Sequence, residues 1–273
     1  MKQLVFISAG KVFPQGAFAF LQFLRQQESF HVKGLFFSPI DYDGMASASH
    51  LHSSAPYMRT KDKERQTVAD HKALFARRCE QENIHFQLHA NEEPWSKELA
   101  AKESRFADLI IASAEVFYAE IDAREPNLFL HEALREAECP IMLLPENFLA
   151  FEQLYFAYDG SRESLHAMKQ FSYLFPQYSS LSSEVLYIKD EASENLPDPD
   201  LLKEYAGLHY DNIGFSKLNF KPADFFAGWI ADKQKVLLIS GSFGRSPLSY
   251  MAKRSFAEKV IREHKHPIFI AHL

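Results

Sequence analysis

Short runs of consecutive apolar residues recur along the chain and alternate with amphipathic segments. In the first half these runs predict five strands, at Leu4–Ser8, Val32–Phe37, His85–His89, Asp108–Ser113 and Ile141–Leu144. Between them, helical spacing predicts helices at Lys61–Glu82, Ser96–Arg105 and Leu128–Ala137. In the second half, strands are expected to start near Leu154, Glu184, Phe215, Val236 and Pro267. Apolar runs without alternation are typical of strands buried on both faces, so the pattern predicts parallel sheets covered by helices.

The two halves repeat one pattern. Three pairs of segments correspond: Gln3–Gly10 with Gln153–Gly160, Ala107–Ser113 with Lys235–Ser240, and Cys139–Leu143 with His266–Ile270. We therefore predict an α/β fold with two doubly wound, Rossmann-like sandwiches in tandem, each on a five-stranded parallel sheet. The repeat places one domain at residues 1–148 and the other at residues 149–273.

Two loops of the second copy have the features of a ligand site. In doubly wound sheets, ligands bind beyond the carboxyl ends of the strands, where the winding reverses. Asp159-Gly160-Ser161 follows the first strand of this copy, and Ser240-Gly241-Ser242-Phe243-Gly244 ends the fourth. Glycines let backbone N–H groups approach anions closely, and the start of a helix favours negative charge. Nine residues separate Gly244 from Arg254, and the next residue, Ser255, can cap such a helix.

These loops, in this order, resemble the universal stress protein family over nearly the whole chain. Tyr158-Asp159-Gly160-Ser161 matches the family's Asp-Gly-Ser strand end, and Gly241 and Gly244 match its glycine loop. The resemblance implies strand order 3-2-1-4-5 and a cytosolic stress-response or regulatory module, not a dedicated enzyme. It implies ATP or another adenine nucleotide as the ligand, with Asp159 by the adenine. The implied binding residues are Asp159, Gly160, Ser240, Gly241, Gly244, Arg254 and Ser255.

Arg254 departs from the family pattern, which has a third glycine at this position, and two versions of the function follow. In one, Arg254 pairs with a phosphate bidentately, as guanidinium groups do. In the other, favoured here, its side chain fills the volume that a phosphate needs, and the module works through protein contacts alone. The glycines then serve only a strand-to-helix turn. Asp159 likewise has a structural interpretation, as part of a turn before a helix capped by Ser161 or Ser164.

The first copy lacks the corresponding groups. Asp159 aligns with Ala9 or Gly10, and the loop after the fourth strand contains Glu115 and no glycine. We expect no nucleotide in this copy. Domains of the family commonly dimerise through their last strand, so the resemblance implies an internal pseudo-dimer, with Ile141–Leu144 antiparallel to Ile268–Ala271. Association of two whole chains as a homodimer is a further alternative.

The charge and the cysteine content of the chain limit which binding partners and which cellular compartment are expected. The 273 residues carry a net charge of −6 with scattered basic residues, which argues against nucleic acid and anionic membranes as partners. No window approaches a membrane-spanning helix. The only two cysteines, Cys79 and Cys139, favour a reducing setting, and we expect a cytoplasmic protein.

Three other interpretations are open but less favoured. His50-x-His52, in an inserted loop at Pro39–Thr60, would need two further ligands to hold a metal, so no metal is expected. An adenylating or ATP-pyrophosphate-cleaving enzyme would need more glycines than the loop after Tyr158 contains. A small-molecule sensor would need an aromatic pocket in the first copy, although core packing explains such residues more often. Its candidate lining residues are Phe13, Phe18, Phe36, Phe37 and Phe117.

Overall fold

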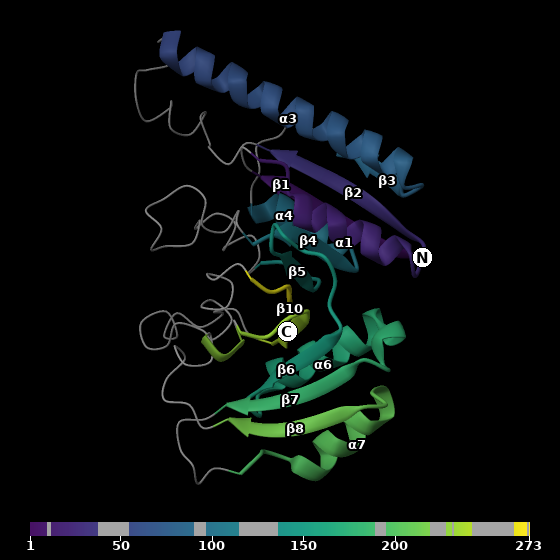
Figure 1. Cartoon of the computed structure of the whole chain (residues 1–273). Helices are drawn as coiled ribbons and strands as arrows, with labels where there is room; N and C mark the ends of the chain where they lie inside the picture. The colour runs from purple at the N-terminus through teal and green to yellow at the C-terminus, as the bar shows by residue number, and fades with distance from the viewer. Residues whose placement is uncertain are drawn as a thin grey trace. The chain divides into compact units, whose positions relative to one another are not determined.

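The computed structural model describes residues 1–9, 12–37, 55–89, 97–114, 136–188, 195–218, 228–230, 232–241, 265–271 and 273. The chain forms two compact units, Met1–Glu138 and Cys139–Leu273. In Figure 1 the first runs from purple to teal and the second from teal to yellow. Among the described residues, no helix is long and apolar enough to cross a membrane.

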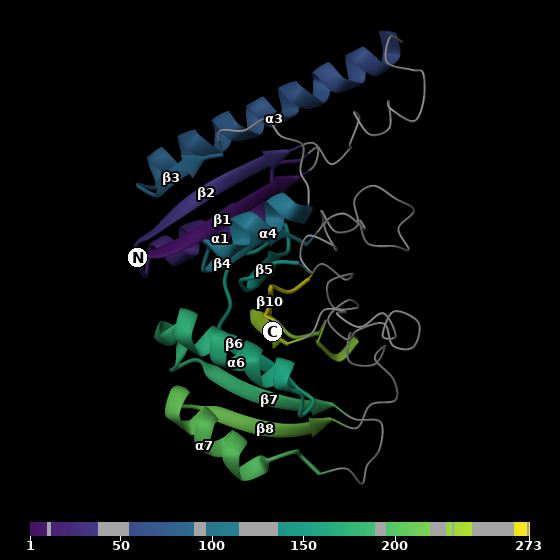
Figure 2. The ribbon, with the colours of Figure 1, turned by 180° about the vertical axis from the view of Figure 1, so that it is seen from behind.

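The first unit contains a parallel sheet with helices on both faces. Its described strands are β1 (Lys2–Ala9), β2 (Phe30–Phe37), β3 (His85–Leu88) and β4 (Leu109–Ser113), in the order β3-β2-β1-β4. Its described helices are α1 (Gln15–Arg25), α3 (Ala55–Gln81) and α4 (Lys97–Arg105). Figures 1 and 2 show α1 and α4 on opposite faces of this sheet. Because both faces are covered, β4 is buried along its whole length, as the apolar runs predicted.

The second unit repeats the arrangement. Its described strands are β5 (Ile141–Leu144), β6 (Gln153–Tyr158), β7 (Ser182–Ile188), β8 (Ile213–Leu218), β9 (Val236–Ser240) and β10 (Ile268–Ile270). They lie in the order β5-β10-β9-β6-β7-β8, which for β6 to β10 is the predicted order 3-2-1-4-5. Helix α6 (Arg162–Leu174) follows β6, a short 3₁₀ helix spans Pro176–Tyr178, and α7 (Pro199–His209) follows β7. The predicted doubly wound fold is confirmed.

Strand β5 pairs antiparallel with β10, with Met142 opposite Phe269. This is the direction expected for these two strands, and it makes the sheet mixed. By sequence β5 closes the first copy of the repeat, whereas by contacts it belongs to the second unit, which starts at Cys139. The boundary at residues 148 and 149 stays a prediction about the repeat.

Phenylalanines fill the core of the first unit. Phe6 on β1 contacts Phe13, Phe18, Phe36 and Phe75, with ring centroids 4.8 to 6.4 Å apart. Phe37 is buried too. Four of the five candidate pocket residues therefore pack among core side chains, and Phe117 lies outside the described residues.

One predicted boundary is wrong. Helix α3 starts at Ala55, so residues 55–60 are helical and do not belong to the predicted loop Pro39–Thr60. Pro56 lies in the first turn, where its missing N–H costs no hydrogen bond. The rest of that loop, with His50 and His52, lies outside the described residues, as does most of the predicted helix Leu128–Ala137.

Candidate functional site

The first candidate loop begins where β6 ends and leads into α6. The Oδ1 atom of Asp159 accepts a hydrogen bond from the backbone N–H of Ser161 at 2.9 Å. Ser161 is the N-cap of α6, and its hydroxyl oxygen accepts from the backbone N–H of Ser164 at 3.1 Å. Glu163 lies in the first turn, where a carboxylate is favourable. The predicted capping role is confirmed, and the Asp159 carboxylate stabilises the turn that starts the helix.

The Asp159 carboxylate is exposed and ionised. Partial desolvation acts to raise its pKa, but hydrogen bonds from Ser161 and Ser164 outweigh this effect, so the pKa lies below its ordinary value. A carboxylate has about four lone-pair positions. Capping therefore leaves Asp159 able to accept a further hydrogen bond from a ligand.

Gly160 has a positive φ of 84° and a close neighbour from another loop. A Cβ atom at this position would lie 2.7 Å from Cγ and 2.9 Å from Cβ of Pro197. The hydroxyl of Tyr158 donates a hydrogen bond to the carbonyl oxygen of Pro197 at 3.4 Å. The segment before α7 therefore lies against the candidate loop. Sequence reasoning missed this contact, because Pro197 lies far along the chain from Gly160 and no local pattern links the two.

The second candidate loop begins where β9 ends, beside β6. The two strands pair in parallel, with Phe156 opposite Ile239. Continuing that register by two residues places Tyr158 beside Gly241. Both residues at the start of this loop, Ser240 and Gly241, are buried. A Cβ on Gly241 would overlap the backbone carbonyl of Glu163 and the backbone nitrogen of Ser164, so this glycine lets β9 approach the first turn of α6.

The structure thus brings four of the seven predicted site residues to one edge of the sheet. They are Asp159, Gly160, Ser240 and Gly241, and for both glycines the local packing alone explains the residue type. Gly244, Arg254 and Ser255 lie outside the described residues. What the described part offers a ligand is the exposed carboxylate of Asp159, next to the N-terminal turn of α6.

Near the end of the corresponding strand in the first unit, a buried serine contacts a buried histidine. Ser8, near the end of β1, lies with its hydroxyl 3.2 Å from Nδ1 of His71 on α3, and both residues are buried. The ring of His71 meets that of Phe13 edge-on, with centroids 5.7 Å apart. Burial lowers the pKa of His71, although the charge of Asp70 acts in the opposite direction. A neutral histidine therefore packs against Ser8 near the end of β1, and no sequence signal linked the two residues.

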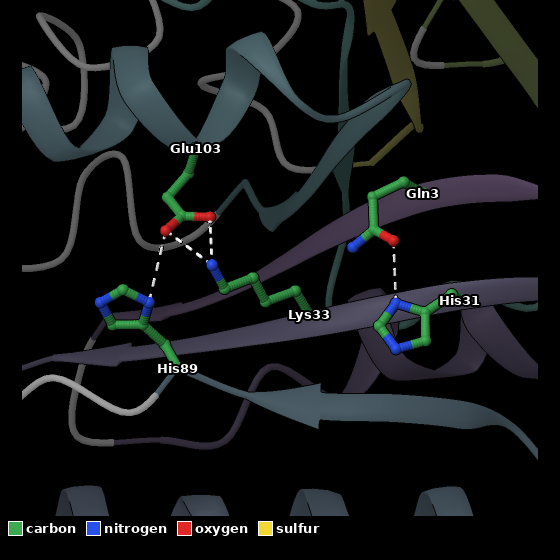
Figure 3. A network of polar contacts seen from close by, with 5 residues as sticks. All are labelled: Gln3, His31, Lys33, His89 and Glu103. Carbon is green, nitrogen blue, oxygen red and sulfur yellow. Dashed lines mark hydrogen bonds and ion pairs between the residues drawn. The ribbon is translucent and has the colours of Figure 1, made fainter.

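A second polar cluster lies on the opposite face of the first unit, between β2 and α4 (Figure 3). Nζ of Lys33 donates to both carboxylate oxygens of Glu103, at 2.7 and 2.6 Å. Nδ1 of His89 lies 3.3 Å from Oε1 of the same carboxylate. Nearby, Nδ1 of His31 lies 2.9 Å from the amide oxygen of Gln3. The Glu103 carboxylate joins α4 to β2 and to the end of β3, which is a structural role.

Neither metal nor thiol chemistry is evident in the described part of the chain. None of its histidine, cysteine, aspartate and glutamate residues form a group of three or more that could hold a metal ion. Cys79 and Cys139 form no disulfide. Burial raises the pKa of Cys79 to about 12, so this thiol is unreactive at neutral pH.

Comparison of the sequence with protein-family models and with curated proteins gives no match. Comparison of the structure with solved structures gives matches over nearly the whole chain. A universal stress protein from Archaeoglobus fulgidus DSM 4304 aligns with a TM-score of 0.69 and 14% identity, over 98% of this chain and 96% of that one. This chain has the universal stress protein fold. A functionally unknown protein from Pseudomonas aeruginosa PAO1 aligns with a TM-score of 0.57 and 12% identity, over 100% of this chain and 92% of that one. The universal stress protein fold therefore accounts for both units.

Proposed function

We propose that this protein is a cytoplasmic regulatory module that acts through protein contacts and is not an enzyme. Only its second unit offers a site for an adenine nucleotide. One comparison between the units carries this proposal. At the carboxyl ends of β6 and β9, the exposed carboxylate of Asp159 lies beside a helix start, whereas near the end of β1 in the first unit His71 contacts the buried Ser8. Each chain then binds at most one nucleotide.

Within this proposal each site residue has a distinct task. Asp159 accepts hydrogen bonds from the base or the ribose, and the backbone after Gly241 and the helix capped by Ser255 receive the phosphates. Arg254 sets the affinity. Its side chain fills the volume that the family's third glycine leaves open, so ATP binds weakly and protein contacts dominate the function.

Exchange of Arg254 tests the proposal. We expect equilibrium dialysis with labelled ATP to find at most one site per chain, and Arg254→Gly to raise the affinity about tenfold by freeing volume. If Arg254 instead pairs with a phosphate, the same substitution lowers the affinity, which would establish the ATP-binding alternative. Ser8→Ala, near the end of β1 in the first unit, is the control and leaves binding unchanged. A second ATP per chain, or pyrophosphate release that depends on a substrate, would contradict the proposal.

Two observations support protein contacts as the mode of action. Leu201 and Leu208, seven residues apart on α7, are 68% and 78% exposed and share one face of the helix. The antiparallel pair of β5 and β10 supports association of the two copies through their last strands as an internal pseudo-dimer. A homodimer of chains stays a prediction, which sedimentation of the purified protein tests.

A further inference from the structure

Helix α7 carries two apolar stripes, and only one of them is buried. Leu202 and Ala206 face the core of the second unit. Leu201, Tyr205 and Leu208 follow the spacing i, i+4 and i+7, so they share a second face of the helix. Leu201 and Leu208 are 68% and 78% exposed. The outer face of a surface helix is ordinarily polar, so this second stripe indicates a contact beyond the core of its own unit.

A tyrosine of the neighbouring helix extends the stripe. Tyr173, near the end of α6, is 59% exposed, and its ring meets that of His209 edge-on, with centroids 5.9 Å apart. His209 also contacts Tyr205, with ring centroids 4.6 Å apart. Five side chains therefore form one surface across two helices, here called the α6–α7 patch: Tyr173, Leu201, Tyr205, Leu208 and His209.

This clustering distinguishes the α6–α7 patch from the rest of the described surface. The other exposed large apolar side chains of the described residues each come from a separate segment: Met1, Val12, Phe106, Leu149 and Leu273. Single exposed apolar residues are ordinary on protein surfaces, whereas a group of them marks an interaction site.

Two carboxylates border the patch and define the charge of its partner. Asp200 and Glu204 are exposed, and Glu204 lies three residues after Leu201 and four before Leu208, which places it beside both leucines. Within the described ranges, neither carboxylate pairs with a basic side chain. Carboxylates four residues apart on a helix repel each other, and a basic partner relieves this repulsion. A second copy of the patch would instead bring the same two acidic residues with it.

We propose that the α6–α7 patch binds an amphipathic helical segment of another protein, with apolar residues against Leu201 and Leu208 and lysine or arginine beside Asp200 and Glu204. This inference rests on the proposed action through protein contacts and names the chemistry of the partner. The partner's apolar residues recur at i, i+3 or i+4, and i+7, because this spacing matches the stripe on α7. Apolar burial supplies the affinity, and the carboxylates select a basic segment over an acidic one.

Two designed peptides test the charge of the partner. Both are fluorescent amphipathic helices of equal length with the same leucines, and lysines flank the leucines in one and glutamates in the other. Fluorescence anisotropy with the full chain should find the lysine peptide bound about tenfold more tightly. Glu204→Lys should weaken binding of the lysine peptide about fivefold and strengthen that of the glutamate peptide. Equal affinities for the two peptides, or no saturable binding of the lysine peptide, would overturn the proposal.

Substitutions on α7 test the place of binding. Leu208→Ser should lower the affinity for the lysine peptide about tenfold, because it removes an apolar contact. Lys203→Gln, at an exposed position on another side of the helix, is the control and should change the affinity by less than about twofold. Urea unfolding of both variants checks that they fold like the wild type. An effect of Lys203→Gln as large as that of Leu208→Ser would place the peptide elsewhere and contradict the proposal.

The other possible occupants of the patch give different results. Self-association in sedimentation that Leu208→Ser abolishes would overturn the basic partner in favour of a second copy, while keeping protein contacts as the mode of action. Binding to phosphatidylcholine vesicles that Leu208→Ser abolishes would assign the patch to a membrane surface, against both this inference and the proposed function. Neither result affects the nucleotide site, which Arg254→Gly tests separately.

Discussion

At the scale of single residues, Gly241 is the described glycine whose surroundings leave least room for a side chain. A Cβ there would overlap the backbone of Glu163 and Ser164. We expect Gly241→Ala to lower the free energy of unfolding by about 3 kcal/mol, because backbone atoms cannot yield as a flexible side chain would. Urea unfolding of the whole chain measures the loss.

Gly207 provides the matched control for this prediction. It lies within α7, and a Cβ added to it would meet nothing within 4 Å. Because alanine is the better helix former, Gly207→Ala should stabilise the protein by about 0.5–1 kcal/mol. Equal effects of the two substitutions would mean that β9 does not approach α6 as closely as described.

His71 makes the first unit sensitive to acid. Its folded-state pKa is lowered by burial, so on acidification the unfolded chain takes up the proton first. The stability that neutral His71 contributes is present above the ordinary value of 6.5 and is lost as the pH falls below it towards the folded-state pKa. The loss has a slope of at most about 1.4 kcal/mol per pH unit.

Unfolding by urea at pH 7.5 and at pH 5.5 measures this loss. We expect the wild type to lose more stability between these two values than His71→Asn, which cannot take up a proton. His85→Gln, at an exposed position on β3, is the control and keeps the acid sensitivity of the wild type. The same acid sensitivity in His71→Asn as in the wild type would assign the effect to other groups.

Local residue roles could be predicted from the sequence, whereas remote partners could not. Ser161 caps α6 by accepting a hydrogen bond from the backbone N–H of Ser164, only three residues away. A serine just before a helix predicts such a cap directly. Gly241 and Glu163 meet only because β9 lies beside β6, and Ser8 and His71 meet only because α3 packs on β1. Such contacts depend on the folded sheet, so the glycine and histidine roles needed the structure.

At the scale of elements, the Glu103 carboxylate links α4 to the sheet. Glu103 pairs with Lys33 on β2 and with His89 after β3, and all three side chains are mostly shielded from solvent. We expect Glu103→Gln to cost about 1–3 kcal/mol of unfolding free energy, because it leaves the Lys33 ammonium without a charged partner. Denaturant unfolding measures this cost.

The exposed pair of Arg105 and Glu138 serves as the control, since Arg105 ends the same helix. Solvent screens such pairs, so Arg105→Gln should leave stability almost unchanged. A larger effect for Arg105→Gln than for Glu103→Gln would contradict the anchoring role.

Elements with strong apolar runs were predicted well, and those with mixed polarity less well. Val236–Ser240 is the strand expected there, because a short run of consecutive apolar residues ending before a glycine is typical of a buried strand. The start of α3 was missed although Ser54 precedes it and Pro56 lies in its first turn, a pattern typical of a helix start, because the residues before it are mostly polar. Asp198 precedes α7 at its N-cap, but no local pattern predicts its left-handed backbone between two prolines.

At the scale of the whole molecule, the repeat predicts two similar units but not where they separate. Internal similarity assigns Ile141–Leu144 to the first copy, since it closes that copy as Ile268–Ile270 closes the second. Contacts assign the same strand to the unit that begins at Cys139. The repeat is defined by similarity along the sequence, whereas the compact units are defined by which strands pair in the folded chain.

Two fragments of the chain distinguish these divisions. Residues 139–273 retain β5, whereas residues 149–273 lack it and leave one edge of β10 unpaired. We expect the longer fragment to unfold cooperatively in urea and to remain monodisperse on size exclusion. The shorter fragment should be less stable by several kcal/mol, because each buried strand residue of β5 contributes about 1.5–3 kcal/mol, and its open apolar edge should promote aggregation. Equal stability of the two fragments would place the division at the repeat boundary, and would mean that β5 covers β10 without stabilising it.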